Sequence, residues 1–367
     1  MNRSTRNPEL RTAFVTGATG LLGNNLTRLL IEQGVRVRAL ARSAEKARTQ
    51  FGNLPVEIVI GDMEHPRGFA AALQGVDAIF HTAAYFRDSY KGGTHWDELH
   101  RTNVLGTAAL LKESYAAGVR RFVHTSSVAV LHGPVGTLID EAMLRREEDA
   151  DDYYRSKILA DREIERFLVA HPDFWAAMVL PGWMHGPGDL GPTSAGQFVL
   201  DFANGRLPGI VPGTFSVVDA RDVAQTLLAV HNSGARGQRY LAAGRNMTVA
   251  DLASVLEHTT GVKAPTRRIP MPLLYVIGFI GELWARVTNR PVLLSLAIVR
   301  LLDREGGRSR FDHVKREQEL GLQFRPVEET MRDEVAWYRA NGWLPTGRRK
   351  VSLRICHDTH WPVVAGP

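Results

Sequence analysis

Short apolar runs alternate with helical patterns through the first half of this 367-residue chain. A brief, mainly apolar run between polar helical stretches is typical of a buried strand. Such runs predict strands at residues 12–17, 35–41, 56–62, 77–84, 120–127 and 174–182. Because parallel strands are joined by crossover helices, the alternation predicts an α/β fold, with a doubly wound parallel sheet covered by helices on both faces.

Three glycines lie between the first predicted strand and the helix that follows it. Gly17, Gly20 and Gly23 are spaced three apart in TGATGLLG. Glycine permits a tight turn and lets a pyrophosphate approach the amino end of a helix, where free N–H groups favour an anion. An ordinary tight turn is the alternative, but the strand before and the helix after the loop favour dinucleotide binding on a Rossmann fold.

The pattern becomes less regular after residue 182, where glycine and proline are frequent. We therefore expect residues 1–182 to form the dinucleotide-binding domain, with 211–243 returning to it. Residues 183–210 and 244–344 are expected to form a smaller, mostly helical substrate-binding part. The basic segment 345–367 is expected to be a flexible tail.

The end of the second predicted strand bears on the choice of dinucleotide. Proteins that bind NAD usually place an acid there for the ribose hydroxyl, but residues 35–43 contain none. They offer Arg42 instead, followed by Lys46 and Arg48, and a guanidinium suits a 2′-phosphate. We predict NADP (NADPH) rather than NAD; the alternative is that Arg42 is a solvated loop residue.

The positive charge of the chain lies mainly in its tails. Of the formal +6, residues 1–11 carry +2 and residues 345–367 carry +3. Because the body is nearly neutral, we expect no nucleic-acid partner. The single cysteine, Cys356, suits a reducing compartment, so a cytoplasmic location is expected. Cys356, His357 and His360 are too weak a set, on a tail expected to be flexible, to predict a metal site.

The most apolar segment, residues 271–284, is 14 residues long and contains Glu282. It is too short to cross a bilayer, so no stable membrane span is expected. We predict a helix whose apolar face is buried; a helix lying in a membrane interface is the alternative. Residues 1–12 are polar and lack the apolar core of a signal peptide.

Several short motifs follow one another along the chain: TGATGLLG at 16–23, Asp62-Met63, HTAA at 81–84, TSS at 125–127, Tyr153-x-x-x-Lys157, PGWMHGPGD at 181–189 and VVDARDVA at 217–224. Together they resemble the extended short-chain dehydrogenases/reductases, and the resemblance runs from about Thr12 to about Leu344. Within that family the chain is most similar to bacterial dihydroflavonol-4-reductase-like and hopanoid-associated sugar-epimerase-like proteins, through the run at residues 191–211.

The resemblance implies the residues of the site. Ser127, Tyr153 and Lys157 match the catalytic set of the family. The cofactor-binding residues, including Arg42 from the charge argument, are Gly17, Thr19, Gly20, Leu21, Leu22, Gly23, Arg42, Asp62, Met63, Ala83, Ala84, Tyr153, Lys157 and Pro181. Family members often dimerise through the region of Asp97 and Asn103, so a monomer and a homodimer both remain open.

The chemistry of the tyrosine and lysine follows from their spacing. Residues four apart on a helix share a face, so Lys157 can favour the ionised form of Tyr153 and donate to the nicotinamide ribose. Tyr153 is therefore the predicted acid/base, and Ser127 is expected to hold the reacting oxygen, as the resemblance implies. Tyr154 points in a neighbouring direction, and we expect it to pack.

Other residues bear on the reaction. Dehydratases of the family carry an acid pair where this chain has Val128-Ala129, and sugar-nucleotide members carry an amide where it has Trp183. Predicted substrate residues are Tyr85, Trp183 and His185, with His185 equally suited to a structural role. The aromatic and apolar residues expected to line the pocket, about half of which are expected to fill the core instead, are Tyr85, Phe86, Trp96, Trp183, Met184, Phe198, Phe202 and Phe215.

These observations favour an NADP-dependent oxidoreductase that reduces an aldehyde or ketone, aromatic or dihydroflavonol-like, to an alcohol. Its partner is then a small-molecule carbonyl or alcohol. An epimerase acting on a sugar or sugar nucleotide with retained NAD(P) is the first alternative, and a non-catalytic NADP-sensing protein is the second.

Overall fold

The computed structural model describes residues 9–86, 95–288 and 296–345. Its larger sheet has seven parallel strands in the order β3-β2-β1-β4-β5-β6-β9. These strands are β1 (Thr12–Thr16), β2 (Arg36–Ala41), β3 (Val56–Ile60), β4 (Ala78–His81), β5 (Arg121–Thr125), β6 (Trp175–Pro181) and β9 (Arg239–Ala242). The order reverses between β1 and β4, so the predicted doubly wound Rossmann sheet is confirmed.

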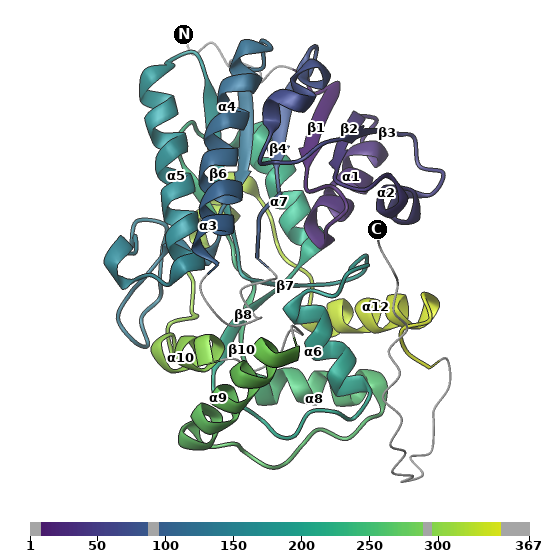
Figure 1. Ribbon diagram of the computed structural model, residues 1–367, viewed down its shortest axis with the longest axis vertical. Coiled ribbons are helices and arrows are strands. Elements are labelled where there is room, and N and C mark those ends of the chain that lie inside the picture. The colour runs from purple at the N-terminus through teal and green to yellow at the C-terminus, as the bar shows by residue number, and fades with distance from the viewer. Residues whose placement is uncertain (1–8, 87–94, 289–295, 346–367) are drawn as a thin grey trace.

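Helices cover both faces of this sheet (Figure 1). The long helices around it are α1 (Leu21–Glu32), α4 (Gly106–Ala116), α5 (Asp152–Ala170) and α7 (Ala220–Ser233), and the short ones are α2 (Ala44–Phe51), η1 (Pro66–Leu73), η4 (Val128–Val130) and η5 (Glu147–Asp149). Val15 packs in an apolar cluster with α1 and α7, whereas its neighbour Phe14 packs in a second cluster with α4 and α5. Because both faces are buried, the strands read as continuous apolar runs.

The helix before α4 departs from a regular α-helix. The sequence predicts a single helix over about 97–117, but α3 (Trp96–Leu99) passes through a π-helical segment, η3 (His100–Leu105), into α4. A π-helical turn holds an extra residue and often marks a functional position. Here it contains Asn103, whose side chain is buried.

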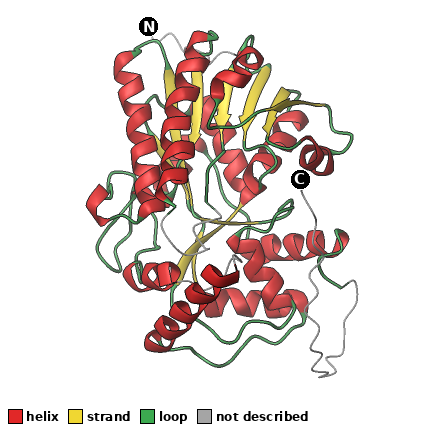
Figure 2. Ribbon diagram, in the orientation of Figure 1, coloured by secondary structure: helices red, strands yellow, loops and turns green. Residues whose placement is uncertain are grey.

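A three-stranded sheet of order β10-β8-β7 lies below the larger one, as Figure 2 shows. Its strands are β7 (Trp183–His185), β8 (Thr214–Asp219) and β10 (Arg245–Thr248), and β7 and β10 are not predicted from the sequence. Helices α6 (Ser194–Ala203), α8 (Val249–Thr260) and α12 (Val327–Ala340) share an apolar cluster with this sheet. The chain rejoins the larger sheet only from α7 onward, since β8 belongs to the smaller one.

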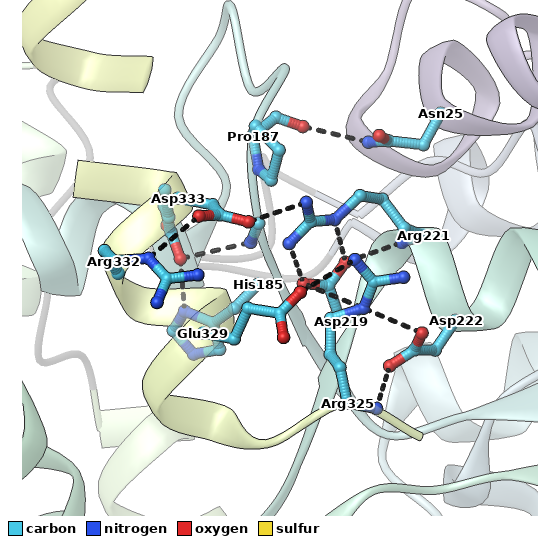
Figure 3. Close-up of polar contacts among 12 residues, drawn as sticks. Asn25, His185, Pro187, Asp219, Arg221, Asp222, Arg325, Glu329, Arg332 and Asp333 are labelled. Atoms are coloured by element: carbon cyan, nitrogen blue, oxygen red, sulfur yellow. Dashed lines mark hydrogen bonds and ion pairs between the residues drawn. The ribbon is translucent and has the colours of Figure 1, made fainter. Parts of the chain in front are cut away.

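Charged residues link the two parts of the molecule (Figure 3). Asp219 caps α7 and accepts from the Arg221 guanidinium, which also donates to Asp333 of α12 at 2.8 Å. The guanidinium of Arg325 donates to the buried carboxylate of Asp222 at 2.8 Å. The VVDARDVA motif therefore fastens α7 to the segment that leads into α12.

The buried apolar face predicted at residues 271–284 accounts for only one side of this helix. These residues belong to α9 (Met271–Thr288), which pairs with α10 (Leu296–Arg304) ahead of α11 (Val314–Leu320). Most large apolar side chains of α9 are exposed, and Leu274 is the fully buried one among them. Within the described residues no helix combines the length and apolarity needed to cross a membrane.

Candidate active site

The glycine loop between β1 and α1 forms a cradle that side chains would fill. Gly17 has φ +64°, and a Cβ added there would lie 2.7 Å from the backbone of Ala83. A Cβ on Gly23 would lie 2.3 Å from the Gly17 carbonyl oxygen, whereas Gly20 has only that same oxygen near it, at 3.3 Å. No side chain caps α1, and its first turn contains no acid. The loop therefore fits the pyrophosphate of a dinucleotide.

Hydrogen bonds hold the ends of β1 and β4 together beside this cradle. The Thr16 hydroxyl accepts from the backbone N–H groups of Thr82 and Ala83, at 3.1 and 3.2 Å. The Thr82 hydroxyl in turn donates to the Thr16 carbonyl at 2.6 Å. Of the other predicted cofactor residues, Ala84 is exposed, Thr19 is half-buried, Leu21 and Leu22 are buried in the first turn of α1, and Pro181 ends β6.

The residues expected to bind the adenosine part lie after β2 and β3. Arg42 directly follows β2 and is exposed, as are Lys46 and Arg48 on α2. Among the described residues, the Arg42 guanidinium has no hydrogen-bond or ion-pair partner, so it is available to a phosphate. Asp62 follows β3 with its carboxylate accepting from the N–H of Glu64 at 3.0 Å, and Met63 is buried.

The predicted catalytic residues come from α5 and the end of β5. Asp151 caps α5 by accepting from the Tyr154 N–H at 2.8 Å. One turn apart on this helix, Tyr153 is half-buried with its ring edge-on to Phe86 at 4.7 Å, and Lys157 is buried. Ser127 lies two residues beyond β5, at the start of η4, against which α5 packs. The fold thus brings the three residues to one end of the sheet.

The two tyrosines have different surroundings. The Tyr154 ring lies under the Arg145 guanidinium, with Cζ 4.8 Å from the ring centre. Burial, together with the nearby Glu305 carboxylate, raises the pKa of Tyr154 well above its usual value near 10. A phenol in this position is a poor proton donor at neutral pH, which leaves Tyr153 as the candidate acid/base.

Asn103, expected from the resemblance only in a region of dimerisation, is bonded between Tyr85 and the helix that carries Tyr153. Its amide oxygen accepts from the Tyr85 N–H at 2.7 Å, and its amide nitrogen donates to the Tyr85 carbonyl at 3.1 Å and to the Ser156 hydroxyl at 3.0 Å. Ser156 donates to the Tyr153 carbonyl at 2.7 Å. Asn103 therefore ties the segment after β4 to α5. Polar and charged residues precede Asn103 in the sequence, so no local pattern marks it as buried.

A buried polar cluster lies behind Lys157. Asp161, one turn further along α5, has one carboxylate oxygen 3.6 Å from His124 Nε2 and the other 3.4 Å from Arg239 Nε. Within the described chain neither Asp161 oxygen accepts a hydrogen bond of ordinary geometry. Burial lowers the pKa of Lys157 to about 8, an effect that Asp161 opposes. Burial also raises the pKa of Asp161 to about 6.

The predicted substrate residues fall into separate groups. Phe86 lies beside Tyr153, and the backbone of Tyr85 is bonded to the Asn103 amide. Trp183 is half-buried and faces Phe215 at 4.7 Å. The side chain of His185 is fully buried and its Nδ1 lies 3.1 Å from a Glu334 carboxylate oxygen, a contact that suits the structural role.

The remaining candidates for the pocket lining lie in different parts of the structure. Phe198 packs 5.7 Å from Trp183, whereas Phe202 is in the core. Trp96 lies under the Arg155 guanidinium at 4.4 Å, and Met184 packs against the core cluster of α1 and α7. Trp183, Phe198 and Phe215 therefore form the aromatic group of the smaller sheet.

A Rossmann sheet with a glycine cradle, and a Tyr-x-x-x-Lys pair on a helix at the carboxyl end of β5, define an extended short-chain dehydrogenase/reductase. The family model described as "NAD dependent epimerase/dehydratase family" matches residues 13–243, and the chain belongs to that family. It is accordingly an NAD(P)-dependent oxidoreductase.

Individual relatives support the same assignment. "Sterol demethylase protein B" of Methylococcus capsulatus is 36% identical over 91% of this chain and 100% of its own length. The "4-hydroxy-2-methyl-3-oxo-4-farnesyl-3,4-dihydroquinoline-1-oxide ketoreductase" of Stigmatella aurantiaca is 30% identical over 80% of this chain and 86% of its own. The crystal structure of gox2253 superimposes with a TM-score of 0.77 and 31% identity, covering 91% of this chain and 99% of that one.

Proposed function

We propose that this protein is an NADP-dependent reductase that converts a ketone or aldehyde group of an apolar substrate to an alcohol. The observation that carries the proposal is the placement of Tyr153 and Lys157. They lie one turn apart on α5, and the Lys157 ammonium is buried against the end of β5, where parallel sheets place their ligands. The chain keeps both residues of the family's Tyr-x-x-x-Lys pair, as expected of a protein that retains catalysis.

The protein groups supply orientation and a proton. When bound, the dinucleotide supplies the hydride that adds to the carbonyl carbon. The Ser127 hydroxyl donates a hydrogen bond to the carbonyl oxygen, and Tyr153 transfers its phenolic proton to that oxygen as the alcohol forms. Lys157 stabilises the tyrosinate that remains, because its positive charge lies on the same face of α5.

The substrate class follows from the aromatic side chains and from the relatives. Trp183 and Phe215 pack ring against ring at 4.7 Å in the smaller sheet, and by the family resemblance Trp183 occupies the position of an amide in sugar-nucleotide enzymes. The names of the two relatives above designate a sterol and a ketone carrying a farnesyl chain. We therefore propose a lipid-like carbonyl compound, with a ring system or a long chain, as the substrate.

The exposed Arg42, supported by Lys46 and Arg48, favours NADPH as the reductant. None of the residues from Val35 to Arg42 is an acid that would bind a free ribose hydroxyl.

The test is a panel of steroid, terpenoid, long-chain and aromatic ketones, with sugar nucleotides, assayed by NADPH consumption. We expect consumption with at least one apolar ketone and stoichiometric formation of its alcohol. Tight NADPH binding without turnover across the panel would identify a sensor instead. Oxidised cofactor retained through purification, with sugar-nucleotide conversion and no net NADPH consumption, would identify an epimerase.

A further inference from the structure

One face of α9 presents a continuous apolar stripe to the outside. Val276, Phe279, Ile280, Leu283, Trp284 and Val287 have exposed fractions of 54, 59, 60, 57, 62 and 78%. Their spacing of three, one, three, one and three residues keeps them on one side of the helix. Figure 1 places α9 at the end of the molecule farthest from the β1–β4 strands. Scattered apolar residues on a surface need no explanation, but a stripe of this length does.

Packing fixes the orientation of this stripe. The opposite side of α9 carries Leu274, which is fully buried with Ile269 and with Val299 of α10. The Tyr275 hydroxyl donates to Asp303 of α10 at 2.9 Å. The segment before α9 is also held, since the Ile269 N–H donates to the Ile210 carbonyl at 2.9 Å. The apolar stripe therefore points outward because the other side of the helix is already in contact.

The charges around α9 are mostly positive. Residues 261–304 contain seven Lys or Arg and only two acids. Lys263, Arg267 and Arg268 are exposed just before α9, and Arg300 is exposed on α10. Of the acids, Asp303 is bonded to Tyr275 and Glu282 is half-buried. Apolar and aromatic side chains flanked by cations suit the headgroup region of an anionic bilayer.

We propose that α9 is an interfacial helix that docks the protein on an anionic lipid surface with its apolar stripe in the membrane. The proposal rests on the proposed function, because a lipid-like ketone resides in that membrane. It needs no segment that crosses the bilayer, which agrees with the absence of a spanning helix among the described residues.

The docking helix is connected through α10, which packs against it, to residues around the candidate site. Leu302 of α10 and the ring of Phe215 both border Gly213, where an added Cβ would lie 3.1 and 3.7 Å from them, and Phe215 faces Trp183. Directly after α10, Glu305 pairs with Arg145 at 2.8 Å, and Arg145 lies over Tyr154. Docking through α9 would therefore bring the part of the protein that contains Phe215 and Trp183 close to the membrane.

The experiment is flotation of the full chain with vesicles of phosphatidylcholine alone or with roughly 30 mol% phosphatidylglycerol. We expect binding to the anionic vesicles that weakens as salt is raised. The variant Phe279→Ser/Ile280→Ser/Leu283→Ser should reduce the partition coefficient by at least about tenfold. The matched control Val169→Ser changes an 84% exposed valine on α5 and should leave binding unchanged. An Arg267→Ala/Arg268→Ala variant should lose the preference for anionic lipid.

Three results would overturn the docking proposal. The first is no binding to either vesicle, or equal binding by the triple variant. The second is a dimer without vesicle binding that the triple variant converts to monomer, which would assign the stripe to a second copy. The third is loss of vesicle binding when residues 346–367 are removed while the triple variant of the full chain still binds, which would assign the binding to the tail.

Turnover of a short, water-soluble ketone separates this proposal from the proposed function. The triple variant should keep that turnover while losing turnover of a vesicle-borne ketone. Vesicle binding through α9 without any carbonyl reduction would refute the proposed function and leave the docking in place.

Discussion

The Lys157 ammonium donates a hydrogen bond to the carbonyl oxygen of Thr125 at 3.1 Å. This contact ties α5 to the last residue of β5, two residues before Ser127. The end of the strand therefore fixes the height of the lysine on the sheet, and α5 places Tyr153 one turn from it.

Tyr153→Phe should lower kcat by roughly 10²–10⁴-fold, because the proton donor is lost, while NADPH affinity stays within about twofold. Steady-state NADPH consumption and fluorescence titration measure the two quantities. Tyr154→Phe is the matched control and should retain most activity. If Tyr154→Phe is the inactive variant, the assignment of the two tyrosines is reversed.

Asp161→Asn should shift the pH dependence of kcat/KM. The Asp161 carboxylate raises the pKa of Lys157 against the lowering by burial, which brings it to about 8. Removing that negative charge lowers the pKa further, so Lys157 loses its proton at lower pH and the alkaline fall in activity moves to lower pH. Glu163→Gln, at a partly exposed position on the same helix, is the control. An unchanged pH profile in Asp161→Asn would separate Asp161 from the function of Lys157.

Arg42→Ala should weaken NADPH binding by about ten- to a hundredfold and leave NADH binding unchanged, because only NADPH carries the 2′-phosphate. Fluorescence titration with both dinucleotides measures the change, and Arg36→Ala at the exposed start of β2 is the control. Equal affinities for NADH and NADPH, unchanged in the variant, would contradict NADP selection.

Arg325→Ala should destabilise the protein by about 2–3 kcal/mol in urea unfolding, because the Asp222 carboxylate is buried and loses its charged partner. The Arg325 backbone N–H still donates to that carboxylate, at 3.0 Å, which limits the loss. Arg332→Ala removes an exposed guanidinium beside Asp333 and should cost less than about 1 kcal/mol. Equal effects of the two variants would show that the link between α7 and α12 is not specific.

Local sequence patterns predict the larger sheet well. The strands β1 to β6 and the cradle of Gly17 and Gly23 can be read from the sequence, because each depends on a short run and the turn that follows it. The pairing of β7 and β10 with β8 could not be read, since these short strands bring together residues far apart in the chain.

Two features of the molecule depend on contacts that no periodicity reveals. His185 pairs with Glu334, which lies 149 residues later, so the sequence left its role open. The apolar stripe of α9 has the same spacing whether it faces a protein core or a lipid, and only the packing of Leu274 on the opposite side distinguishes the two.

Asn103 uses both ends of its amide, one on the backbone of Tyr85 and the other shared with Ser156 of the catalytic helix. A change in the length of the segment at Tyr85 would therefore be felt at the phenol of Tyr153, the proposed proton donor. Relatives that adapt to new substrates should then exchange side chains along this segment and conserve its backbone path, so selectivity would evolve without loss of rate.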